Sequence, residues 1–136
     1  MYAATADLAA RLGDLFAAIY DSDADAAEDL ADAQAEIDGC IGKRYAIPVI
    51  STAALPLLKS WCLTLAEERA YARSAGSSYA EKVASRVAQV RKYLELVRSG
   101  DFQLPGAVEN PAAAGSQISV IAGDPPIFDR DGMEGY

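Results

Sequence analysis

The sequence predicts an all-α protein with a small four-helix body and an extended C-terminal arm rich in proline and glycine. Apolar residues recur at helical spacing through residues 5–45 and 55–99, which is the pattern of helices that bury one face. After Pro105 this spacing stops, and residues 105–136 hold four prolines and five glycines. A chain of 136 residues has room for one domain with a modest core. We therefore expect a helical body over residues 1–104 and an arm over residues 105–136.

The first predicted helix begins near the N-terminus and runs to about Tyr20. Thr5 is a residue type that caps helix N-termini, and Asp7 then lies in the positive first turn. One face of this helix is apolar and comprises Leu8, Leu12, Leu15, Phe16 and Ile19. The acidic segment 21–25 then reads as a turn that ends this helix and starts the next.

The second predicted helix runs from that turn to about Tyr45, and the later helices must cover it. Glycine inside a helix costs about 1 kcal/mol relative to alanine, so Gly39 and Gly42 indicate close packing by a neighbouring backbone. Pro48 prevents the helix from continuing. The predicted buried stripe comprises Leu30, Ala33, Ile37, Ile41 and Tyr45.

Two further helices complete the predicted body. Pro56 fits the first turn of the third helix, which ends near residues 74–76. Ser77 or Ser78 starts the fourth helix, and Gly100 fits the position just after its end. The third helix has the apolar stripe Leu58, Trp61, Cys62, Leu65, Ala66 and Tyr71, and the fourth has Tyr79, Val83, Val87, Val90, Leu94 and Val97.

Charge divides the sequence into three blocks of alternating sign. The net charge is −8, with −9 in residues 1–38, +6 in residues 39–100 and −5 in residues 101–136. An acidic balance argues against a dedicated nucleic-acid binder. The alternation suits copies that meet acidic face to basic face, and a simple solvated surface explains it equally well. The sequence predicts neither a membrane span nor a signal peptide.

The sequence offers little for catalysis, so we expect no enzymatic activity, no cofactor and no metal. It contains no histidine, the commonest general base and a frequent zinc ligand. Residues 21–25 resemble the opening of a calcium loop, but the sixth and twelfth positions hold Ala26 and Asp32 instead of glycine and glutamate. A capped helix start is the better interpretation. Cys40 and Cys62 lie in helical patterns, which favours buried free thiols in a reducing compartment over a disulfide.

The arm has two alternative interpretations. Its composition cannot bury a core of its own, and only Gln117–Ala122 could pair as a short strand. Its last ten residues nevertheless include Ile127, Phe128, Met133 and Tyr136, which simple linkers lack. The segment is either a frayed terminus or an arm that becomes ordered on a partner, and we favour the arm.

The order of motifs along the chain resembles a family of small Mu-like prophage proteins that was first described as a domain of unknown function. The motifs are M-Y-A-A-T at 1–5, A-x-A-E-I-D-G at 33–39, R-Y-x-I-P at 44–48, A-E-x-R at 66–69 and F-x-R-D-x-M-x-G-Y at 128–136. Together they cover nearly the whole chain.

The resemblance implies a structural virion protein, the head–tail connector or adaptor that forms a ring beneath the portal of a tailed phage. About a dozen copies would surround the DNA channel, through which DNA passes without specific binding. The implied partners are the portal protein and a stopper or tail-side neck protein, and no membrane is involved. The implied location is the virion neck, with assembly in the host cytoplasm.

For such a connector, the arm's apolar residues and the charge pattern of the body indicate which residues make these contacts. We expect the arm to bind the portal through Phe128, Arg130, Met133 and Tyr136. We expect the subunit interface at Asp25, Asp29, Asp32, Glu36, Lys43 and Arg44. The four acids line one helical face, where like charges at i, i+4 oppose the helix unless a basic partner lies nearby. A fully solvated face is the alternative for these acids. For the whole protein, the alternative is a small DNA-associated helical packaging module.

Overall fold

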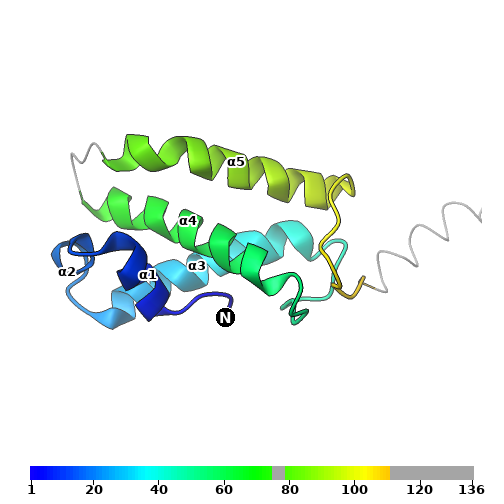
Figure 1. Ribbon diagram of the computed structural model, residues 1–136, viewed down its shortest axis with the longest axis horizontal. Coiled ribbons are helices and arrows are strands. Elements are labelled where there is room, and N and C mark those ends of the chain that lie inside the picture. The colour runs from blue at the N-terminus through cyan, green and yellow to red at the C-terminus, as the bar shows by residue number, and fades with distance from the viewer. Residues whose placement is uncertain (75–78, 111–136) are drawn as a thin grey trace, which may run out of the picture.

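A computed structural model describes residues 1–74 and 79–110 of the chain, and these residues form five helices and no strand. The helices are α1 (Thr5–Leu12), α2 (Leu15–Ile19), α3 (Asp23–Ile41), α4 (Leu55–Arg73) and α5 (Tyr79–Ser99). The three long helices lie side by side along the body, and α1 and α2 pack at the end where α3 begins (Figure 1). The all-α prediction is confirmed.

The predicted first helix is divided in two at Gly13. This glycine has φ +62°, in the left-handed region that glycine adopts easily, and α1 ends there. The N-cap position is Ala4, not Thr5, and the Asp7 carboxylate accepts a hydrogen bond from the Ala4 N–H at 2.9 Å. That hydrogen bond lowers the pKa of Asp7. The prediction of one helix to Tyr20 was wrong because both short helices turn apolar residues to the core, which preserves the apolar spacing across the break.

The second predicted helix, α3, is shorter than expected. It ends at Ile41, and the Tyr45 N–H donates to the Ile41 carbonyl at 2.9 Å. Tyr45 remains in the buried stripe, but its backbone forms an isolated antiparallel bridge with Glu109 instead of a further helical turn. Gly39 has open space around it, so the expected close packing there was wrong, whereas Gly42 lies against the Ile47 side chain.

The core lies between the three long helices, and the apolar stripes predicted for them are confirmed at its centre. Ala33 of α3 and Ala66 of α4 are fully buried in it. At one edge Trp61 stacks on Tyr93 with ring centroids 6.1 Å apart. The largest fully buried apolar side chains are Leu8, Leu30, Ile37, Ile41, Leu58, Leu65, Val83, Leu94 and Val97.

The third and fourth predicted helices correspond to α4 and α5. Pro56 lies in the first turn of α4, and Gly100 follows α5 with φ +92°, both as predicted. Cys62 is buried and Cys40 half-buried, and both are free thiols. Burial raises the pKa of Cys62 to about 11. Among the described helices, none has the length and apolar character needed to cross a membrane.

The described part of the predicted arm is residues 105–110, which run back along the connector between α3 and α4 (Figure 1). The rest of the arm, including the possible strand Gln117–Ala122, lies outside the described residues, as do Ser77, Ser78 and the side chain of Tyr79. The predicted portal contacts Phe128, Arg130, Met133 and Tyr136 also lie outside the described residues.

Candidate interaction surfaces

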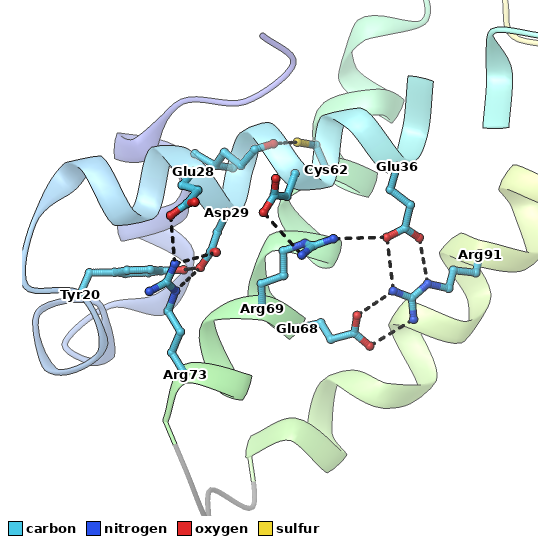
Figure 2. Close-up of polar contacts among 11 residues, drawn as sticks. Tyr20, Glu28, Asp29, Glu36, Cys62, Glu68, Arg69, Arg73 and Arg91 are labelled. Atoms are coloured by element: carbon cyan, nitrogen blue, oxygen red, sulfur yellow. Dashed lines mark hydrogen bonds and ion pairs between the residues drawn. The ribbon is translucent and has the colours of Figure 1, made fainter. Parts of the chain in front are cut away.

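Charged side chains from four helices meet in a row of ion pairs between the helices, which we call the polar seam. Most of it is visible in Figure 2, where arginines of α4 and α5 reach acids of α3. The seam comprises the acids Asp29, Asp32, Glu36, Glu67 and Glu68 with the arginines Arg11, Arg69, Arg73, Arg86 and Arg91.

Asp29 is the most buried of the four acids that the sequence placed on one face of α3, with 5% exposure. Arg73 donates to its two carboxylate oxygens from Nε at 2.8 Å and from Nη2 at 3.1 Å, and the Tyr20 hydroxyl donates at 2.6 Å (Figure 2). Burial and the hydrogen bond to Asp29 raise the pKa of Tyr20, and the hydrogen bond from Arg73 to Asp29 raises that of Arg73. A fully solvated acidic face is therefore wrong for Asp29.

Glu36 and Asp32 are paired with arginines of their own chain. Arg91 of α5 donates to Glu36 at 2.9 Å and to Glu68 of α4 at 2.7 Å, so one guanidinium joins three helices (Figure 2). These hydrogen bonds, first that to Glu36, raise the pKa of Arg91. Arg69 lies 3.7 Å from Asp32 and 3.9 Å from Glu36. The structure thus brings three of the four predicted acids together with internal partners, and their place at a subunit interface stays a prediction.

Glu67 is a seam residue that sequence reasoning missed. Its side chain is 3% exposed, and its Oε1 lies 3.1 Å from Arg11 of α1 and 3.2 Å from Arg86 of α5. Arg11 also donates to the Thr64 hydroxyl at 3.1 Å. A buried carboxylate needs a cation or several hydrogen bonds, and here two arginines tie α1 and α5 to α4. The available signal was the place of Glu67 directly after the buried residues Leu65 and Ala66.

The connector between α3 and α4, residues 42–54, is held at one point by the N-terminal segment. The Tyr2 hydroxyl accepts the Val49 N–H at 3.0 Å and donates to Asp38 at 2.5 Å. Burial is the main cause that raises the pKa of Tyr2, followed by its hydrogen bond to Asp38. A tyrosine at position 2 belongs to no helical period, so the sequence pattern gave no physical sign of this contact.

Residues 105–110 hold the other side of the connector. The Ala46 N–H donates to the Val108 carbonyl, and the Asn110 N–H donates to the Arg44 carbonyl, each at 2.8 Å. These bonds flank the antiparallel bridge and fix the direction of the chain as it reaches Asn110.

Large apolar side chains are exposed at this end of the body. Ile47, Ile50 and Val108 are 49%, 79% and 65% exposed. Lys43, which is exposed, and Arg44, which is half-buried, belong to the same connector. We call these five residues the connector surface. A hollow of about 220 Å³ lies there, lined by Ala46, Pro48, Val49, Ile50, Ser51, Gly106 and Val108. Clustered exposed apolar residues of this kind mark contacts with partners more often than scattered ones.

Three further observations concern possible sites for chemistry. A groove of about 410 Å³ runs along the N-terminal segment, and its charged groups are Asp7 and Lys59, paired at 3.2 Å. In the part of the chain that the structure describes, no group of three His, Cys, Asp or Glu residues could hold a metal ion. The segment 21–25 contains the start of α3, which confirms the helix start, but Ser22 at the N-cap position makes no side-chain capping hydrogen bond.

Comparison with known proteins gives two matches. A family model described as Bacteriophage Mu, Gp36 matches residues 2–122. Gene product J of Escherichia phage Mu is 33% identical over 110 residues, which cover 79% of this chain and 73% of that protein. No solved structure matches the chain.

Proposed function

The chain belongs to the bacteriophage Mu Gp36 family, and from this premise we propose that it is a head–tail connector of the virion neck. The family and the phage Mu relative make it a Mu-like phage protein and support a place among virion proteins. In the proposed role, about a dozen copies form a ring beneath the portal around the DNA channel. Each copy acts structurally, without catalysis, and contacts the portal protein and a stopper or tail-side neck protein.

The observation that carries the proposal is the match over residues 2–122, which includes the whole helical body and the beginning of the arm. The body supports the proposal because the polar seam and the core hold its helices together, while residues 105–110 are hydrogen-bonded to the connector. The 26 residues after Asn110 therefore start from a defined point and could reach at most on the order of 90 Å if fully extended. That length suits an arm that docks on a neighbouring protein.

In this proposal the docking contacts are Phe128, Arg130, Met133 and Tyr136. Aromatic residues and arginine are enriched among the residues that contribute most to binding energy at interfaces. The four docking residues are three apolar side chains and one arginine, and residues 128–136 also carry three carboxylates, so we expect apolar insertion into a pocket whose rim is polar.

Deleting residues 124–136 tests the docking role. The shortened chain should keep the helical circular dichroism and melting temperature of the full chain, because the described core lies within residues 2–104. When it replaces the full chain in phage production, electron microscopy should show DNA-filled heads and free tails that remain separate. Phe128→Ala and Tyr136→Ala should each reduce joining, whereas Gln117→Ala, a matched arm variant, should not. Normal numbers of tailed particles from the deletion would contradict the proposal.

The alternative of a DNA-associated packaging module makes a different prediction. Binding to duplex DNA that weakens steeply with salt would support that alternative. The net charge of −8 and the internal pairing of Arg69, Arg73 and Arg91 favour little or no such binding. A gel-shift titration with bare duplex at low salt checks this directly.

A further inference from the structure

We propose that copies of this chain contact one another head to tail, with the connector surface of one copy seated against α2 of the next. The second surface, which we call the α2 surface, comprises the exposed Ala17 and Ala18, the half-buried Leu15, Phe16 and Ile19, and the acids Asp14, Asp21, Asp23 and Asp25. This inference rests on the proposed function, because a ring requires contacts between copies, and it names the two surfaces that meet.

The first step is that α2 is an apolar helix whose side chains are incompletely covered. Its sequence is L-F-A-A-I, and none of its five residues is buried. Its large side chains are half-buried against the core, with Phe16 on Tyr20 at a ring-centroid distance of 5.2 Å, whereas Ala17 and Ala18 are exposed. Among the described helices, α2 contacts only α1 and α4. Within the described residues, the side of α2 at Ala17 and Ala18 is therefore open to a partner.

The second step is that the two surfaces carry opposite charge. Residues 13–25 contain four carboxylates and no cation, whereas the connector contains Lys43 and Arg44 and no carboxylate. Within the described residues, the four carboxylates form none of the ion pairs of the polar seam. Asp29, which lies at the same end of α3, is already satisfied by Arg73. Complementary charges fix the orientation of two proteins, and the apolar residues between them supply most of the affinity.

The third step is the position of the two surfaces. In Figure 1, α2 lies at the left end of the body, and the connector with residues 105–110 lies at the right end. A contact that joins one surface of a copy to a different surface of the next copy is heterologous. Such a contact repeats in one direction and closes into a ring when the rotation between copies allows. Each copy can therefore contact one neighbour through its α2 surface and another neighbour through its connector surface.

Glu109 tests whether attraction between opposite charges holds the two surfaces together. It is a carboxylate on the 105–110 segment, opposite Tyr45 and next to Val108 of the connector surface. In the proposed contact it opposes the acids of the α2 surface, so Glu109→Lys should strengthen association between copies, whereas most interface substitutions weaken it.

Sedimentation velocity of the purified full chain tests the proposal. We expect self-association between about 10 µM and about 1 mM at low salt that weakens at high salt. Lys43→Glu and Asp21→Lys should each weaken it about tenfold, and the double variant should recover most of the loss, because the reversed charges attract again. Ile50→Asp should also weaken it. Lys92→Glu, the same charge change on an exposed residue of α5, is the matched control and should change nothing.

Three results would overturn the proposal: a monomer at every concentration, single charge reversals that leave association unchanged, or a double variant no better than the singles. Failure here is distinguishable from failure of the proposed function. If these variants have no effect but deletion of residues 124–136 still separates heads from tails, the surfaces are wrong and the docking role stands. If the variants behave as expected but the deletion leaves joining normal, the contact between copies stands and the docking role does not.

Discussion

The polar seam and the connector surface each reverse the usual placement of residue types, because the seam buries charged side chains and the connector surface exposes apolar ones. In the seam, carboxylates as buried as Glu67, at 3% exposure, lie between helices. In the connector surface, Ile50 is 79% exposed. Burying a charge is costly unless it is paired, so the seam acts as a set of internal ties. Within the described residues, the exposed apolar side chains of the connector surface form no such tie, and we propose that they serve recognition. The helices' charges therefore hold the body together, and its contacts with other proteins are expected at its ends.

The largest expected loss of stability follows a substitution at the centre of the polar seam. Glu67→Ala should lower the free energy of unfolding by about 3 kcal/mol, because Arg11 and Arg86 then lose their carboxylate and a cavity replaces it. This figure is at the low end for a broken buried pair because both guanidiniums are partly exposed. Urea unfolding followed by circular dichroism measures the change. Ile50→Asp on the connector surface is the matched comparison and should shift stability by less than about 0.5 kcal/mol. Equal losses in the two variants would remove the distinction between the regions.

A smaller effect is expected where the N-terminal segment holds the connector. Tyr2→Phe should cost about 1 to 2 kcal/mol, because the buried Val49 N–H loses its acceptor. The loss should be local, so hydrogen exchange at Val49 should speed up more than exchange in the middle of α4. Unchanged exchange at Val49 would show that the connector is held by other contacts.

Two glycines give a matched pair of effects on stability, one similar in size to that of Tyr2→Phe and one smaller and opposite in sign. Gly100 has φ +92°, so Gly100→Ala should cost about 1 to 2 kcal/mol from backbone conformation alone. Its new Cβ would approach the Arg44 guanidinium at 2.9 Å, but that flexible group can shift. Gly39→Ala lies within α3 with open space around it and should stabilise the protein by up to about 1 kcal/mol. Thermal melts of the two variants should therefore move in opposite directions, and shifts of the same sign would refute this assignment.

The smallest effect is expected at the exposed edge of the seam. Arg91→Ala should cost less than about 1 kcal/mol although Arg91 joins Glu36 and Glu68, because its side chain is 47% exposed and water and salt screen the pairs. Repeating the unfolding titration at high salt should shrink the difference from the unmodified chain. A loss above about 2 kcal/mol would mean that the seam acts as one coupled network, with no weak edge.

The sequence predicted the features that one helix determines by itself. Helical spacing placed Leu30, Ile37 and Leu94 in the core, and the residue types of Pro56 and Gly100 marked helix ends. Such signals come from residues close together in the chain, so they can be recognised without knowing how the helices pack.

The missed features depend on residues far apart in the chain. For Asp29 the sequence suggested a second subunit or solvent, because its actual partner Arg73 is 44 residues away and on another helix. Tyr45 left the helix because residues near Glu109 offered its backbone neighbours other hydrogen bonds. At the candidate site, the sequence pattern predicted Lys43 and Arg44. It did not predict the exposure of Ile47 and Ile50, because that exposure depends on how the connector folds.

Electron microscopy of the purified full chain mixed with the portal protein of the same phage is the most direct test of the central claim. We predict a ring of this chain on the portal, with α2 of each copy against the connector surface of its neighbour and the segment around Phe128 against the portal. A chain that does not bind the portal, or one whose Phe128 and Tyr136 fill the interior of their own body, would contradict it.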